Sequence, residues 1–139
     1  MSGYRVSTDP ADVDVDVVAD FLRDEAYWSL GRPREVVERS LAASRTFSVL
    51  DGDGAMVAFA RVVTDGATFG WICDLFVVED HRGRGIGHRL VDAIVTAPEL
   101  ADMKRLLLAT ADAHGLYTDL DFVPLAQPER WMERNGPGA

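Results

Sequence analysis

Glycine alternates with other residues in the segment Arg82-Gly83-Arg84-Gly85-Ile86-Gly87, which follows an apolar run. Because glycine has no Cβ atom, such a turn lets phosphate oxygens reach the main-chain N–H groups. An amphipathic run follows, and the N-terminus of a helix there would add unpaired N–H donors and the positive end of its dipole. Arg82 and Arg84 bring positive charge to a chain whose formal net charge is −9. These residue types predict a site for a phosphorylated ligand.

Two familiar phosphate-binding patterns fit this turn poorly. A P-loop ends in Gly-Lys-Ser/Thr, which is absent here. The dinucleotide fingerprint places its third glycine one position later and needs an acidic residue about 20 positions on, whereas these glycines stand at 83, 85 and 87. A helix start that merely contains glycines is the structural alternative. Spacing alone does not choose between that alternative and a phosphate site.

The elements that must position the turn alternate in type along the chain. Apolar residues at helical spacing predict one helix through Val17, Val18, Phe21 and Leu22, a second after Pro33, a third from Ile86 to Val95 and a short one through Leu116. Short apolar runs predict strands over 4–6, 46–50, 56–63, 68–78, 105–109 and 122–125. We therefore expect the α+β or α/β class, with a mixed, mostly antiparallel central sheet of about six strands flanked by about four helices.

Composition describes one ordinary globular unit. With 139 residues, 47% hydrophobic and 27% charged, we expect a single domain over 1–134 and a flexible tail over 135–139. No apolar run approaches the roughly 20 residues of a membrane-spanning helix. The acidic balance argues against a nucleic-acid partner. One cysteine, Cys73, excludes an internal disulfide, so we expect a cytoplasmic protein.

Two motifs resemble those of the GNAT family of N-acetyltransferases. Leu75-x-Val77 followed by Arg82-x-x-Gly85-x-Gly87 is similar to the family's motif A. The run 113–117, Ala-His-Gly-Leu-Tyr, with Phe122 beyond it, is similar to the landmark Ala-x-x-Leu-Tyr-x-x-x-Gly-Phe. The expected order of elements also matches, so the resemblance spans 4–125. Within the family, Tyr27-Trp28, Gly31-Arg32 and Cys73-Asp74 resemble a small bacterial branch.

The resemblance implies direct transfer of an acetyl group from acetyl-CoA to a primary amine within a ternary complex. It places the pantetheine arm along a strand and the pyrophosphate on the glycine turn. The cofactor residues that it implies are Leu75, Phe76, Val77, Arg82, Gly83, Arg84, Gly85, Ile86, Gly87, His88 and Thr110.

Two proton transfers need side chains. The acceptor amine must lose a proton whose pKa is about 10, and Asp74 is the candidate base, with an ion pair as its alternative role. The leaving thiolate must gain a proton, and Tyr117 matches the family's tyrosine for that step. No metal is expected, since the histidines lack ligand spacing.

The acceptor pocket is implied to include Tyr27, Trp28, Arg32 and Arg61. Arg32 could bind a substrate carboxylate, and Arg61 within a strand suggests pairing with Asp74 or with a ligand. The acidic net charge favours cationic amines instead, so the acceptor stays open. The resemblance also allows a homodimer.

Departures from the family pattern keep other functions open. Asp121 stands where glycine is usual, and Thr110 stands where asparagine is frequent. A non-catalytic acyl-CoA-binding or regulatory module on the same fold is therefore one alternative. An unrelated nucleotide-binding protein that uses the glycine turn is another.

Overall fold

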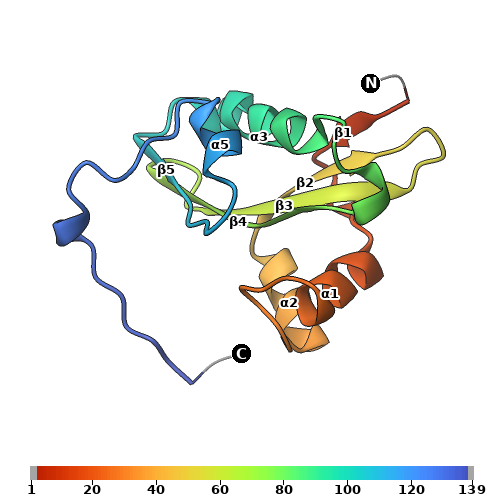
Figure 1. Cartoon of the computed structure of the whole chain (residues 1–139), viewed down its shortest axis with the longest axis horizontal. Helices are drawn as coiled ribbons and strands as arrows, with labels where there is room; N and C mark the ends of the chain where they lie inside the picture. The colour runs from red at the N-terminus through yellow and green to blue at the C-terminus, as the bar shows by residue number, and fades with distance from the viewer. Residues whose placement is uncertain (1–2, 138–139) are drawn as a thin grey trace.

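Five strands form one sheet in the order β1-β2-β3-β4-β5 in the computed structural model, which describes residues 3–137 (Figure 1). Strands β1 to β4 pair antiparallel with their chain neighbours, and β5 joins β4 in parallel. No helix in this part of the chain is long and apolar enough to cross a membrane. The strands are β1 Arg5–Ser7, β2 Arg45–Leu50, β3 Met56–Thr64, β4 Phe69–Val77 and β5 Arg105–Leu107.

Helices cover both faces of the sheet. Figure 1 shows α3 and α5 on one face and α1 and α2 on the other. The fold is thus the expected mixed α/β arrangement of a mostly antiparallel sheet between helices. The α-helices are α1 Val15–Asp24, α2 Arg34–Ala42, α3 Ile86–Thr96, α4 Pro98–Ala101 and α5 His114–Thr118. Short 3-10 turns lie at Pro10–Asp12, Glu79–His81 and Pro128–Arg130.

Local capping explains where the helices begin. The side chain of Asp14 accepts a hydrogen bond from Val17 N at 3.2 Å and so starts α1 at Val15. Residues 13–17 alternate between valine and aspartate as a strand does, and this cap overrides that local pattern. Helix α2 begins directly after Pro33, as the sequence predicts. Pro98 stops α3 and opens the short α4.

Each face of the sheet has its own apolar core. On the α3 face, Ile86, Leu90 and Ile94 pack with strand residues that include Phe47 and Val62. On the α1 and α2 face, the ring of Phe21 stacks on Phe76 with centroids 4.1 Å apart. Burying each such side chain contributes about 1.5–3 kcal/mol. Together these contacts hold β4 between the two helical layers.

The expected strand over 122–125 is wrong. This segment pairs with no strand within residues 3–137, and Val123 is 79% exposed. The sheet described here therefore has five strands rather than about six. Apolar character alone does not make a strand, because its backbone must also find a neighbour to pair with. Of the expected tail, 135–137 are exposed, and 138–139 lie outside the described residues.

Candidate active site

The edge of β4 is open beside the predicted chemistry. Strand β5 pairs with β4 only at Phe69–Trp71, so the described residues give β4 no strand partner on that side from Ile72 onward. On the other side, the register with β3 shifts between Phe59 and Arg61. Asp74 lies at this bulge with φ 56°, in the left-handed region that few non-glycine residues adopt. Beyond Trp71 this edge of β4 therefore has no strand partner among the described residues and could hydrogen-bond an extended ligand.

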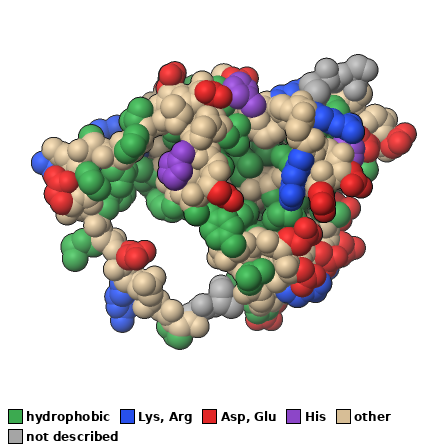
Figure 2. Space-filling view, in the orientation of Figure 1, with side chains coloured by type: hydrophobic (Ala, Val, Ile, Leu, Met, Phe, Trp, Pro, Cys, Tyr) green, Lys and Arg blue, Asp and Glu red, His purple; other side chains and the backbone are tan. Residues whose placement is uncertain are grey.

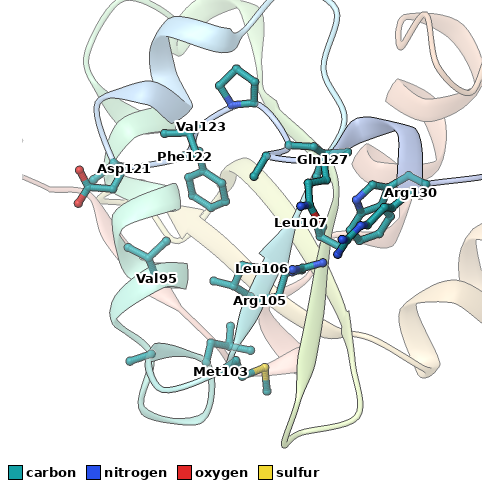
Figure 3. A pocket seen from close by; sticks show the side chains of 17 residues that line it. Val95, Met103, Arg105, Leu106, Leu107, Asp121, Phe122, Val123, Gln127 and Arg130 are labelled. Atoms are coloured by element: carbon teal, nitrogen blue, oxygen red, sulfur yellow. The ribbon is translucent and has the colours of Figure 1, made fainter.

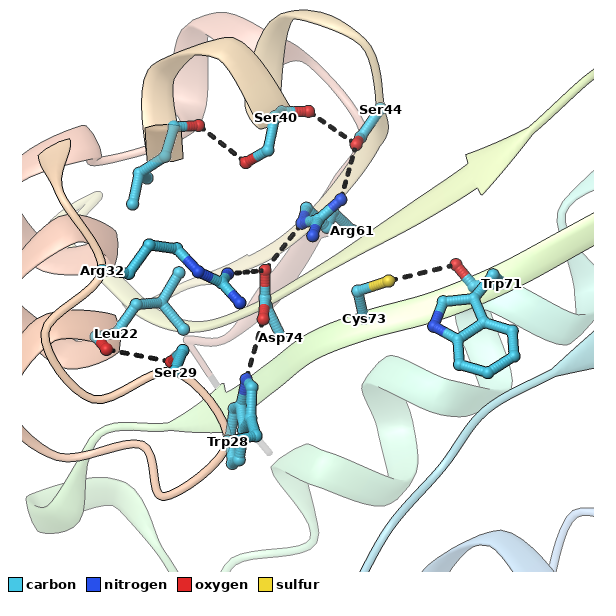
Figure 4. A network of polar contacts seen from close by, with 11 residues as sticks. Leu22, Trp28, Ser29, Arg32, Ser40, Ser44, Arg61, Trp71, Cys73 and Asp74 are labelled. Carbon is cyan, nitrogen blue, oxygen red and sulfur yellow. Dashed lines mark hydrogen bonds and ion pairs between the residues drawn. The ribbon is translucent and has the colours of Figure 1, made fainter. Parts of the chain in front are cut away.

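Asp74 is the centre of a buried polar network (Figure 4). Its side chain is only 2% exposed. Trp28 donates from Nε1 to Oδ1 at 2.8 Å. Arg32 donates from Nη1 to Oδ2 at 3.0 Å, and Arg61 donates from Nε to the same oxygen at 2.6 Å. The network fastens the loop between α1 and α2 onto β3 and β4.

These contacts bear on the role predicted for Asp74. Both of its oxygens accept hydrogen bonds, and two of the three donors are guanidinium groups. The pairing of Arg61 with Asp74 is confirmed, and Arg61 also donates to Oγ of Ser44 at 3.2 Å. Asp74 therefore has the ion-paired arrangement that is the alternative to a general base.

A cavity of about 360 Å³ gathers most of the residues predicted to act. It holds the two predicted catalytic residues, the four predicted acceptor residues and two of the predicted cofactor residues. These are Asp74, Tyr117, Tyr27, Trp28, Arg32, Arg61, Leu75 and Thr110. Its wall also includes residues that sequence reasoning did not assign to a site, among them Trp71 and Asp112. No motif or spacing marks these two, because folding alone brings them to the wall.

Tyr117 enters the cavity from α5. The side chain is buried, and its ring meets Phe122 edge-on at a centroid distance of 5.7 Å. Burial raises the pKa of the Tyr117 phenol to about 12, with smaller contributions from Tyr27 and Asp112. The phenol thus stays protonated near neutral pH and can donate. Tyr27 closes the rim by accepting a hydrogen bond from Ala111 N at 2.9 Å.

Cys73 also lines the cavity, but its environment makes the thiol unreactive. Burial is the main cause that raises the pKa of its thiol to about 11. The thiolate is the reactive form, so this environment does not suit a nucleophile. Within residues 3–137 no group of His, Cys, Asp or Glu side chains could hold a metal ion.

The glycine turn lies at the N-terminus of α3, outside this cavity. Gly83 and Gly85 have φ 78° and 74°, and Gly85 is the N-cap residue, without a side chain that could occupy the first N–H groups. Arg89 N makes the first helical bond to Gly85 O at 3.1 Å, which leaves the earlier N–H groups for a ligand. Arg82 Nε donates to Val77 O at 2.9 Å and fixes the turn to the end of β4. A helix N-terminus of this kind can bind an anion such as a phosphate group.

Gly87 and Asp121 stand at positions with different structural requirements. A Cβ on Gly87 would lie 3.6 Å from Cδ2 of Leu116 and 3.8 Å from Cγ2 of Val77, so this glycine lies where α3 packs against its neighbours. Asp121 has φ 70°, the backbone conformation that glycine would adopt. The departure from the landmark therefore keeps a left-handed turn before Phe122.

A second hollow, of about 790 Å³, lies between α3, β5 and the C-terminal segment (Figure 3). Leu106, Phe122, Leu125 and Trp131 give it apolar walls. None of the predicted catalytic, cofactor or acceptor residues lines it. The predicted chemistry therefore belongs to the 360 Å³ cavity and not to this hollow.

Figure 2 shows that acidic side chains gather over the region of α1, while hydrophobic side chains line the hollowed middle of the same face.

Comparisons with known proteins agree with this geometry. A family model described as an acetyltransferase (GNAT) domain matches residues 43–124. A crystal structure of a protein assigned to the GNAT family from Xanthomonas campestris pv. campestris has a TM-score of 0.93 and 40% identity, covering 99% of this chain and 96% of that chain. A candidate acetyltransferase from Gibberella zeae is 29% identical over 133 residues, 82% of this chain and 75% of the relative. A Clostridium acetobutylicum structure described as an acetyltransferase with acetyl-CoA shares the fold at a TM-score of 0.66 and 18% identity, covering 97% of this chain and 96% of that chain.

Proposed function

Because the chain belongs to the GNAT family of acetyltransferases, we propose that it transfers the acetyl group of acetyl-CoA to a primary amine. One observation carries this proposal. The buried, protonated Tyr117 lies in a cavity beside the free edge of β4, and the glycine turn begins a few residues beyond the end of that strand. The Clostridium acetobutylicum neighbour, described with acetyl-CoA, supports this donor.

Acetyl-CoA would use two backbone features of this chain. The N–H groups at the start of α3 would bind its pyrophosphate, with Arg82 and Arg84 adding charge. The unpaired edge of β4 from Leu75 to Val77 would hydrogen-bond the pantetheine arm as an added strand. An N–H of that edge would also stabilise the negative oxygen that forms when the thioester carbonyl is attacked. Thr110, on the cavity wall, would contact the arm from the opposite side.

The transfer balances with three proton movements. The neutral amine attacks the carbonyl carbon, the new C–N bond forms, and the C–S bond breaks. The departing thiolate takes the phenolic proton of Tyr117, the amine nitrogen loses its proton to water, and the Tyr117 phenolate regains a proton from water. Since both oxygens of Asp74 hold donors, we assign Asp74 to positioning Arg32 and Arg61. Nearby positive charge lowers the pKa of an ammonium group, so these guanidinium groups would favour the neutral amine.

The test is calorimetric titration with acetyl-CoA, CoA, ATP and NAD, applied to the parent and to Gly85→Glu. We expect selective binding of CoA and acetyl-CoA by the parent and loss of that binding in Gly85→Glu, because a carboxylate would occupy the anion site. A screen of amines then follows CoA release. A folded parent that binds ATP or NAD and ignores CoA would contradict the proposal.

A second candidate function is a non-catalytic acyl-CoA-binding module. The observation that favours it is the engagement of Asp74 with three donors, which leaves the cavity without an obvious free base. Such a module would bind acetyl-CoA as tightly as an enzyme does. It would release no CoA with any amine, and Tyr117→Phe would change nothing that can be measured.

The partner that we propose for the C-terminal segment is a second copy of the chain. Val123 is 79% exposed and Met132 is 96% exposed, and Trp131 lies beside the apolar hollow next to β5. Large contiguous exposed apolar patches mark interaction sites, and Val123, Leu125 and Trp131 line the same hollow. Light scattering on the parent and on Trp131→Ser tests this, with a dimer expected for the parent and a monomer for the variant.

A further inference from the structure

Two arginines share one carboxylate on the wall of the 360 Å³ cavity. The side chains of Arg32 and Arg61 are 15% and 14% exposed, and both pair with Oδ2 of Asp74. Two guanidinium groups and one carboxylate leave one net positive charge in this cluster. The rest of the protein is acidic, with a formal net charge of −9 for the whole chain. A buried excess of positive charge needs a counter-charge.

The hydrogen bonds of the two guanidinium groups also indicate a negatively charged partner. Each guanidinium carries five N–H donors. Arg32 donates to Asp74 from Nη1, and its Nε is buried without a partner among the described residues. Arg61 donates from Nε and Nη1 to Asp74 and Ser44. Within residues 3–137 most N–H donors of the pair therefore have no protein acceptor, and among their nitrogen atoms Nε of Arg32 is the one that is both buried and unpartnered. A buried donor without an acceptor costs free energy.

A cationic acceptor would fit this cluster badly. Both oxygens of Asp74 already accept hydrogen bonds, so they offer little to an ammonium group. Asp112, the other carboxylate on the cavity wall, is exposed to solvent. A second ammonium group on the substrate would instead meet two guanidinium groups of the same sign.

We propose that the acceptor is a small amine bearing an anionic group, which Arg32 and Arg61 bind while its amine faces the acetyl donor. This inference rests on the proposed function and names its substrate class. The anion supplies the missing acceptors and neutralises the excess charge, and Arg32 can bind a carboxylate or phosphate through two parallel N–H donors. A cavity of about 360 Å³ that also holds the acetyl group restricts the acceptor to a small molecule.

The experiment compares amines that differ in one charge. The matched pair is β-alanine and β-alaninamide, and 2-aminoethyl phosphate distinguishes a phosphate from a carboxylate. Propylamine and putrescine supply a neutral tail and a second cation. Initial rates of CoA release give kcat/KM for each. The amide has the more acidic ammonium group and presents more neutral amine, so this bias runs against the expected result.

We expect at least one anionic amine to exceed its uncharged counterpart at least tenfold in kcat/KM. In Arg32→Gln the KM for the anionic amine rises, so the ratio of its kcat/KM to that of the uncharged counterpart falls close to one. Arg32→Lys keeps part of this ratio. Arg23→Gln, an exposed arginine at the end of α1, is the matched control and keeps the full ratio. Unchanged acetyl-CoA affinity shows that Arg32→Gln is folded, because Asp74 still pairs with Arg61 and Trp28.

Equal or better rates with β-alaninamide, propylamine or putrescine would overturn the inference. A preference for anionic amines that survives Arg32→Gln would overturn it too. If no amine is acetylated although acetyl-CoA binds, the proposed function fails and the inference is judged by calorimetry on the CoA complex. It then stands if an anionic amine binds and Arg32→Gln abolishes that binding, and it falls if none binds.

Discussion

The Nε atom of Arg61 lies 2.6 Å from Oδ2 of Asp74, across the bulge that separates β3 from β4. Asp74 is held there in a left-handed backbone conformation, φ 56°. Arg32 and Trp28 reach the same carboxylate from the loop between α1 and α2. The Asp74 side chain thus joins the strand that carries the open edge to the loop between α1 and α2, which lines the 360 Å³ cavity.

Removing the Asp74 carboxylate should lower the free energy of unfolding. Asp74→Ala leaves two largely buried guanidinium groups without their counter-ion, and breaking such a pair costs about 3–5 kcal/mol. Asp74→Asn, which keeps the shape but not the charge, should cost less. Urea denaturation measures both. Asp24→Ala removes an exposed ion pair with Arg23 and is the matched control; an Asp74→Ala loss no larger than that control would disprove the structural role.

Tyr117→Phe should slow transfer about 100-fold, because a positioned proton donor typically contributes at least this much. Burial raises the pKa of Tyr117 to about 12, so the phenol remains protonated up to about pH 11. Ionisation of Tyr117 should therefore cause no fall in the rate below about pH 11. Any fall below that pH should be the same in the parent and in Tyr117→Phe. Because the pKa of Tyr117 is higher in the folded than in the unfolded protein, the contribution of this shift to stability is complete below pH 10 and is lost as the pH rises toward 12. A pH–rate profile of both proteins decides, and an unchanged kcat in the variant would remove Tyr117 from the mechanism.

Cys73 should react slowly with alkylating agents. A pKa raised from 9.0 to about 11 lowers the thiolate fraction at pH 8 about 100-fold, since each unit is a factor of ten. Mass spectrometry of iodoacetamide-treated protein gives the rate. The same protein unfolded in urea is the control and should react as a free cysteine does. Equal rates in the two states would show that the thiol is not shielded.

Asp121→Gly should raise stability by up to about 1 kcal/mol. At φ 70° glycine carries no steric penalty, whereas other residues pay about 1–2 kcal/mol. Asp119→Gly is the matched control, because Asp119 has φ −62° and glycine should lower stability there. Thermal unfolding of the two variants separates them. A gain in both, or in neither, would mean that backbone strain at Asp121 is unimportant.

Much of the fold follows from local patterns. Apolar spacing located α1, α2 and α3, and short apolar runs located β2, β3 and β4. The prediction of a strand over 122–125 failed because this segment is apolar like a strand but pairs with no strand among residues 3–137. Pairing depends on residues far along the chain, and a local pattern carries no record of them.

The sequence by itself determined the glycine turn at the start of α3, because glycine spacing followed by a helix leaves free N–H groups at the helix N-terminus. It also marked Tyr117 and the residues around Asp74 as candidates through their motifs. Only the tertiary structure decided that Asp74 is engaged by Trp28, Arg32 and Arg61. Hydrogen bonds of that kind join residues 13 to 46 positions apart, and whether a carboxylate is free or paired depends on which side chains folding brings within about 3 Å.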